Sequence, residues 1–165
     1  MRKLIFLLFI LQWPSLAIAE LSKAATAYLL NQAVISYELG DYKTAARELK
    51  GLAIQGDAIA QTLLGDMYYK GWGVPQDYKL ALEWYLKAAE KGDANAQYNL
   101  GLMYYNGSGV KQDLIQAYIW INLAAISRDK DSNEARNDVV INLTTSQLEE
   151  AQRQMQEWLV KHRKS

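Results

Sequence analysis

Apolar residues recur every four positions in two stretches of the chain, which is the spacing of one face of an α-helix. The two stripes consist of Ala60, Leu64 and Tyr68 in the first stretch and of Ala96, Leu100 and Tyr104 in the second. The stretches are 36 residues apart, and residues 56–89 and 92–125 align without a gap and are identical at 19 of 34 positions. The centre of the chain is therefore a repeat, and each copy predicts a pair of helices.

The identical positions include residues that shape each helix pair. A glycine inside the first helix indicates that another backbone packs closely there, and a glycine at its end stops the helix. A Gly-x-Gly-Val turn follows, an aspartate caps the second helix, and a tryptophan lies in the buried stripe of that helix. These structural residues are Gly65, Gly71, Gly73, Asp77 and Trp84 in the first copy and Gly101, Gly107, Gly109, Asp113 and Trp120 in the second.

A degenerate helix pair is predicted before the two copies. It occupies residues 20–55, where Ser22 caps a helix that ends at Leu39 and a second helix covers residues 42–55. Its match to the repeat is partial, as expected for the end of a stack of repeats.

Capping helices are predicted after the two copies, in residues 128–165. The last of them begins at Thr144, with Gln147 three residues later as its capping-box partner. Together with the repeats at 56–91 and 92–127, the pattern predicts an all-α solenoid of about four helix pairs.

The first residues have the pattern of a secretory signal. Two basic residues, the apolar run Leu4–Leu11 and the small-x-small ending Ala17-Ile18-Ala19 follow one another. A membrane anchor is the alternative, but a helix that spans a bilayer needs about 20 apolar residues. We expect residues 1–19 to be removed and residues 20–165 to act in the periplasm or outside the cell, without a stable membrane anchor.

Composition narrows the chemistry. The 165 residues carry 18 basic and 18 acidic side chains, which gives zero net charge and no sign of a nucleic-acid-binding surface. The chain has no cysteine and its only histidine is His162, so thiolate zinc sites and Ser-His-Asp relays are hard to build. We expect a protein without enzymatic activity, cofactor or metal.

The repeat resembles a known family. Residues 60–89 and 96–125 share the pattern Ala-Gln-x-x-Leu-Gly-x-Met-Tyr-Tyr-x-Gly-x-Gly-Val-x-Gln-Asp, followed by Ala-x-x-Trp and Ala-Ala. This pattern resembles the Sel-one-like repeat, a relative of the tetratricopeptide repeat. The resemblance implies a right-handed superhelix of helix pairs that serves as a scaffold or adaptor for other proteins. A cysteine-rich branch of the family is linked to β-lactam binding or hydrolysis, and this chain departs from that branch because it lacks cysteine.

One motif leaves an enzymatic alternative open. Ser108 and Lys111 have the Ser-x-x-Lys spacing of penicillin-interacting enzymes, so a cell-wall-active or β-lactam-interacting hydrolase of the same fold is the second hypothesis. The motif falls in the predicted turn between two helices, and the chain has no Ser-Asp-Asn or Lys-Thr-Gly motif. A structural role in the turn is therefore favoured.

The preferred hypothesis is a scaffold that binds a partner protein on the concave face of the solenoid. The faces of the two first helices opposite the apolar stripes differ between the copies, and such differences suit a binding surface. The predicted contact row is Thr62, Asp66, Tyr69, Tyr98, Leu102 and Tyr105. The identity of the partner is open, and we expect the protein itself to be a monomer.

Overall fold

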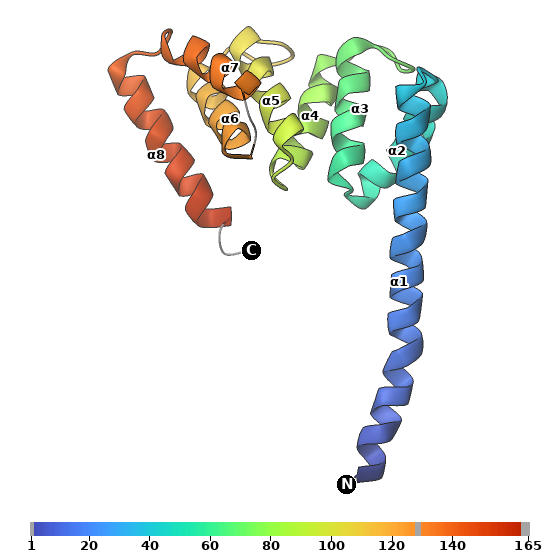
Figure 1. The fold of residues 1–165 in the computed structure, drawn as a ribbon. Helices are drawn as coiled ribbons and strands as arrows, with labels where there is room; N and C mark the ends of the chain where they lie inside the picture. The colour runs from blue at the N-terminus through green and yellow to red at the C-terminus, as the bar shows by residue number, and fades with distance from the viewer. Residues whose placement is uncertain (1, 128–129, 163–165) are drawn as a thin grey trace.

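The computed structural model describes residues 2–127 and 130–162, and every regular element in this part of the chain is a helix. The helices are α1 (Arg2–Glu38), α2 (Tyr42–Gln55), α3 (Ala58–Lys70), α4 (Tyr78–Ala89), α5 (Ala94–Asn106), α6 (Leu114–Ser127), α7 (Lys130–Val140) and α8 (Thr145–His162). From α1 to α6 each helix packs on the next, and α7 and α8 both pack on α6. Figure 1 shows the resulting row, with α1 and α8 at opposite ends. The predicted all-α repeat solenoid is confirmed.

The predicted helix caps are present. Asp57 Oδ1 accepts the backbone N–H of Ala60 at 2.8 Å, and Asp93 accepts that of Ala96 at the same distance one repeat later. The second helix of each pair is capped by Asp77 and by Asp113 in the same way. Gly71 and Gly107 end α3 and α5 in the left-handed conformation, with φ of 72° and 69°.

The glycines inside α3 and α5 allow the two helices of each pair to pack closely. A Cβ atom at Gly101 would lie 2.5 Å from Cγ1 of Ile121 and 3.1 Å from its backbone nitrogen. At Gly65 it would lie 2.7 Å from two ring atoms of Tyr85. These approaches agree with the close packing that the sequence predicts.

A second glycine in each turn joins one repeat to the preceding one. Gly73 has φ of 70°, and a Cβ atom there would lie 2.3 Å from the backbone oxygen of Tyr42, at the start of α2. Gly109 has the same relation to Tyr78, at the start of α4, at 2.7 Å. The turns of successive repeats thus rest on the backbone of the helix pair before them.

The core extends along the whole row in two clusters that both reach Tyr68. Trp120 is buried as predicted and meets Trp158 of α8 edge-on, with ring centroids 5.9 Å apart. Trp84 is only half-buried, and the Nζ of Lys87 lies over its ring, 4.2 Å from the ring centroid. The two equivalent tryptophans therefore differ in burial.

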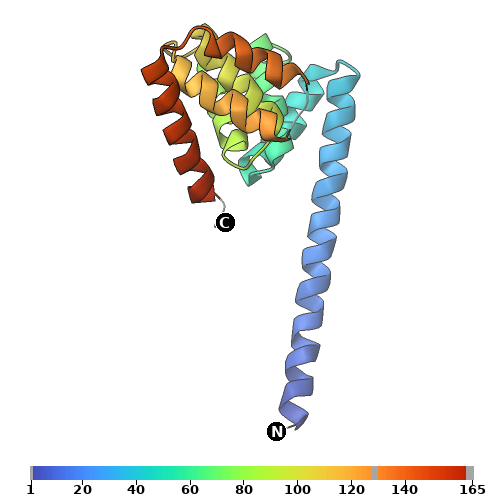
Figure 2. The same ribbon diagram turned by 60° about the vertical axis from the view of Figure 1, so that its left-hand side comes forward.

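The start of the chain differs from the prediction. Ser22 does not cap a helix, because α1 runs without a break from Arg2 to Glu38 and the backbone oxygen of Ser22 accepts a bond from the Thr26 hydroxyl inside it. Apolar and alanine residues on both sides of Ser22 favour a continuous helix. Figures 1 and 2 show that the first half of α1 projects away from the other helices. No helix is both long and apolar enough to span a bilayer among the residues described.

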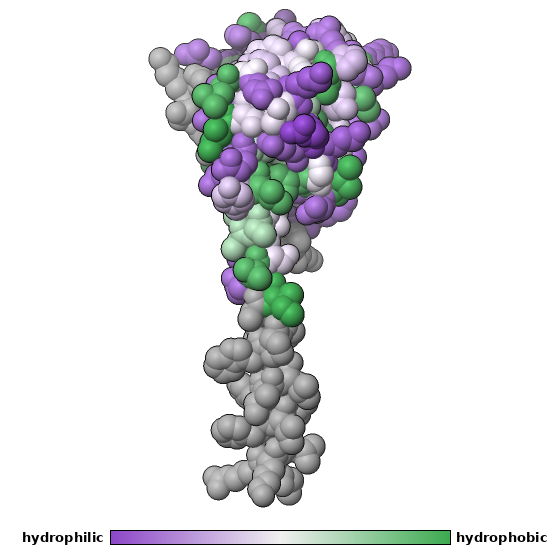
Figure 3. Space-filling model, turned by 90° about the vertical axis from the view of Figure 1, so that its right-hand side faces the viewer, coloured by the Kyte–Doolittle hydropathy of each residue, from purple (hydrophilic) through white to green (hydrophobic). Residues whose placement is uncertain are grey.

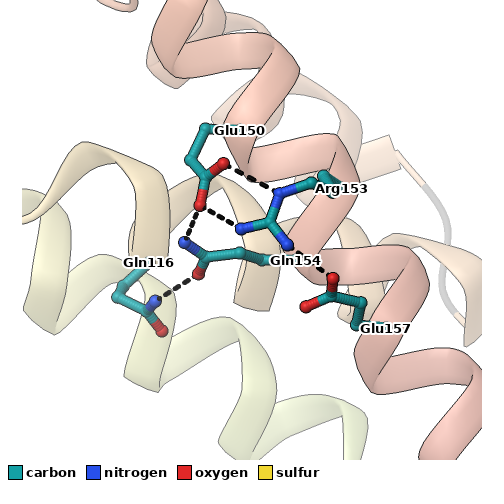
Figure 4. Close-up of polar contacts among 5 residues, drawn as sticks. All are labelled: Gln116, Glu150, Arg153, Gln154 and Glu157. Atoms are coloured by element: carbon teal, nitrogen blue, oxygen red, sulfur yellow. Dashed lines mark hydrogen bonds and ion pairs between the residues drawn. The ribbon is translucent and has the colours of Figure 1, made fainter.

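The C-terminal end is closed by α8, as predicted. Gln147 and Thr144 form the expected capping box, with bonds of 3.0 and 3.3 Å between side chains and backbone N–H groups. On the side facing α6, the side chain of Gln116 donates to Gln154 at 3.2 Å. The outer side of α8 carries ion pairs of Arg153 with two glutamates, drawn in Figure 4.

Candidate partner-binding site

The helices α3 and α5, which are the first helices of the two repeats, contact each other although α4 lies between them in the sequence. We call the surface that α3 and α5 share the inner face. All six residues of the predicted contact row lie on these two helices. Five residues of the predicted contact row line one or both of two cavities, and the sixth, Thr62, is buried. Leu102 lines both cavities and separates them.

Asp66 lies at the centre of the inner face and accepts hydrogen bonds from three other helices. The Tyr85 hydroxyl of α4 donates to Oδ1 at 2.5 Å, and the side-chain amide of Asn99 in α5 donates to the same oxygen at 3.1 Å. The Tyr37 hydroxyl of α1 donates to Oδ2 at 3.4 Å. One carboxylate thus links α1, α3, α4 and α5.

Burial controls the electrostatics of this cluster. Loss of solvation raises the pKa of the Asp66 carboxyl above its ordinary value of 3.8, although the bond from Tyr85 and the charge of Lys70 act in the opposite direction. Burial, followed by the nearby carboxylate, raises the pKa of the Tyr85 and Tyr37 hydroxyls. Both tyrosines therefore stay protonated and remain donors to Asp66.

A cavity of about 250 Å³ opens beside this cluster. It is lined by Asp66, Tyr69 and Lys70 of α3, Tyr85 of α4, and Asn99, Leu102, Met103 and Asn106 of α5. The half-buried side chains of Tyr69 and Leu102 supply apolar surface. The wall therefore combines two side-chain amides, a carboxylate and an ammonium group with apolar surface, which is a set that can bind a polypeptide.

Five of the lining residues were missed by the sequence prediction. Met103 is the same in both copies, where it corresponds to Met67, and the other four differ between the copies. Lys70 and Asn106 occupy equivalent positions of the two copies, and both Tyr85 and Asn99 differ in kind from their counterparts. A search for every position that differs between the copies would have found these four. Only the fold shows that a residue of α4, Tyr85, reaches the same cavity as residues of α3 and α5.

Tyr98 and Tyr105 lie on the other side of Leu102 and face a different cavity, of about 320 Å³. The far wall of this cavity consists of Glu134, Ala135, Asp138 and Val139 of α7. Asn142, which follows α7, donates to the Tyr105 hydroxyl at 3.4 Å. These two tyrosines therefore face part of the chain itself.

The prediction that Thr62 belongs to the contact row is wrong. Thr62 is 4% exposed, and its hydroxyl lies 3.0 Å from both Ala58 O and Asp93 Oδ1, so these two acceptors share its one proton. Because Asp93 caps α5, Thr62 supports the junction between the two repeats. It is not available to a partner, since its hydroxyl lies within that junction.

Ser108, the candidate nucleophile of the alternative hypothesis, lies in the turn directly after α5. Its backbone N–H donates to Met103 O at 3.0 Å and so helps to end that helix. In residues 2–127 and 130–162, no group of three or more His, Cys, Asp or Glu side chains could hold a metal ion.

The fold and the inner face define a helical repeat protein of the kind that binds other proteins. The family model of the Sel1 repeat matches residues 58–93 and 94–129. Residues 58–129 are therefore two Sel1 repeats. No curated protein matches the chain.

Two solved structures extend the comparison. The protective antigen c5321 of uropathogenic Escherichia coli, which displays an SLR fold, is 33% identical, with a TM-score of 0.77 over 82% of this chain. A Sel1 repeat protein from Oxalobacter formigenes is 33% identical, with a TM-score of 0.63 over 67% of this chain. This chain spans 30% of the first protein and 46% of the second.

Proposed function

We propose that the protein is a non-enzymatic scaffold that acts outside the cytoplasm and holds a segment of a partner polypeptide on its inner face. The observation that carries this proposal is the cavity beside Asp66, which combines polar and apolar groups on a surface formed by three helices. Scaffolding is the general role of Sel1 repeat proteins. The location outside the cytoplasm rests on the signal-like pattern of residues 1–19.

The lining of the cavity suggests what kind of segment fits. The side-chain amides of Asn99 and Asn106 can donate and accept, so they suit the main chain of an extended peptide. Oδ2 of Asp66 accepts only the long bond from Tyr37 among the described residues, so it is open to a donor from the partner. Tyr69 and Leu102 offer apolar surface for a side chain of the same segment.

A selection of displayed random peptides on the purified protein tests this proposal. Peptides that bind the wild type should lose about tenfold in affinity for the double variant Tyr69→Ala, Leu102→Ala, because hot-spot side chains contribute 1 kcal/mol or more. Far-UV circular dichroism should be unchanged, since both residues are only half-buried.

The matched control is the double variant Lys79→Ala, Glu83→Ala, which changes two exposed side chains of α4. Peptides should bind this control like the wild type. Equal affinity for the Tyr69, Leu102 variant and for the control would exclude the inner face as the binding surface.

A further inference from the structure

The side of α1 that faces away from α2 carries a regularly spaced stripe of residues that are apolar except for Gln32. Leu30, Ala33 and Tyr37 pack toward the core, whereas the stripe lies on exposed positions. Its members are Leu21, Ala25, Tyr28, Gln32 and Ile35, followed by Leu39 directly after the helix. Figure 3 shows exposed hydrophobic surface along the described part of α1, where it projects below the other helices.

The exposure of the stripe is large. Leu21 is 72% exposed, Tyr28 64%, Ile35 46% and Leu39 80%. Single exposed apolar residues are common, but a row of them along one side of a helix, interrupted here only by Gln32, marks an interaction site. The stripe is complete without residues 1–19, so the expected removal of the signal would leave it intact.

The spacing of the stripe indicates a helical partner. Successive members are separated by four, three, four, three and four residues, which is the heptad spacing of a coiled-coil seam. From Leu21 to Leu39 the seam is roughly 27 Å long at the rise of an α-helix. A second helix with the same spacing would cover it by knobs-into-holes packing.

The positions beside the seam favour a second copy of this chain. They are Ser22, Ala24, Leu29, Asn31, Ser36 and Glu38, of which Glu38 alone is charged. Charges at such positions set the choice of partner, and their near absence allows two identical seams to meet without repulsion. A lipid surface would require basic residues beside the apolar face, and Lys23 lies away from the seam.

The charged surface at the opposite end of the solenoid argues against an assembly in which copies pack head to tail. The outer side of α8 carries Arg153 in ion pairs with Glu150 and Glu157, together with exposed glutamines (Figure 4). An apolar seam that packed on this side would remove those charges from water without replacing their solvation. Two seams that pack on each other give a closed dimer instead.

We propose that α1 is the interface of a symmetric dimer, in which the seam of one copy packs on the same seam of another. The proposal concerns the outer side of α1 and is independent of the inner face. It replaces the expectation of a monomer.

Sedimentation velocity is measured on the purified protein, in the form that accumulates in the expressing cell, and gives its mass in solution. The wild type should sediment with twice the mass of one chain, and Tyr28→Glu, Ile35→Glu should sediment as a monomer with unchanged circular dichroism. The control Ile54→Glu, Val160→Glu changes exposed apolar residues of α2 and α8 and should remain a dimer.

A cysteine cross-link locates the contact, because the natural chain has no cysteine. Tyr28 lies near the middle of the seam. It would face its counterpart in a parallel pair and would lie roughly 6 Å from it along the axis in an antiparallel pair. Mild oxidation of Tyr28→Cys should give a covalent dimer, whereas Val160→Cys should stay a single chain. A monomeric wild type, a dimer that survives Tyr28→Glu, Ile35→Glu, or a cross-link through Val160→Cys would overturn the proposal. A monomer that binds vesicles through Tyr28 would also overturn it and assign the seam to lipid.

Discussion

The two repeats have the same backbone design but different chemistry on the inner face. In the first repeat, Asp66 and Tyr85 form a partly buried hydrogen bond, whereas the equivalent residues of the second repeat are the apolar pair Leu102 and Ile121. The caps and glycines that guide the chain are identical in both. The helix path is therefore fixed by one set of residues, and the surface offered to a partner is varied by another.

Gly101→Leu tests the shared part of this design and should have the largest effect. We expect the free energy of unfolding to fall by about 3 kcal/mol through overpacking. The new side chain would meet backbone atoms of Ile121 and Ala117 at 3.1 and 3.2 Å, and these atoms cannot move without shifting α6. Urea unfolding followed by circular dichroism at one protein concentration gives the value.

Gly51→Leu is the matched control for that variant. Gly51 lies in α2 at an exposed position with no atom within 4 Å of its Cβ direction. Leucine there should stabilise the protein by about 0.5–1 kcal/mol, because it removes a glycine from a helix interior. If Gly101→Leu behaves like Gly51→Leu, the glycine does not serve close packing.

Tyr85→Phe tests the part that differs between the repeats. Removal of the hydroxyl takes away the shortest hydrogen bond to Asp66 while the carboxylate remains buried, so we expect a loss of about 2 kcal/mol. Tyr78→Phe is the control, because its hydroxyl accepts a 3.2 Å bond from Gln76 near the surface and should matter little.

A second background sharpens this test. In the variant Asp66→Leu, which copies the apolar residue of the second repeat, no carboxylate is left for Tyr85 to stabilise. Tyr85→Phe should then change the free energy of unfolding by much less than in the wild type. An equal loss in both backgrounds would mean that the hydroxyl does not act through Asp66.

The sequence predicted those features that depend on local chemistry. Caps such as Asp93, turn glycines such as Gly107 and the capping box at Thr144 follow from what helix ends require, and all of them are present. The fold class followed from the repeat itself.

Features that depend on contacts between distant residues were not predictable in this way. Thr62 was expected at the surface because of its helix face, but its hydroxyl bonds to Asp93, 31 residues later. The link from Asp66 to Tyr37 and Tyr85 joins residues of three helices, and no spacing in the sequence reveals it. The exposed side of α1 also becomes visible only when the packing of α1 on α2 is known.

A smaller difference between the repeats lies where the end of the second helix of each repeat meets a glutamine of the first helix. Gln61 and Gln97 both donate to a backbone oxygen of the preceding helix pair, at 2.9 and 3.1 Å. Lys91 then donates to Gln61 Oε1 at 3.2 Å and also to the backbone oxygen of Gly56. The equivalent of Lys91 in the second repeat is Ser127, and Gln97 Oε1 has no partner among the described residues.

Lys91→Ser makes the first repeat like the second at this junction and should have the smallest effect. The loss should be about 0.5–1 kcal/mol, because the ammonium group is exposed and water replaces part of its bonding. Lys79→Ser, which changes an exposed lysine of α4, should leave the unfolding midpoint unchanged and serves as the control. If Lys91→Ser also leaves the midpoint unchanged, the two junctions are energetically equivalent. The differences between the repeats would then be confined to the inner face.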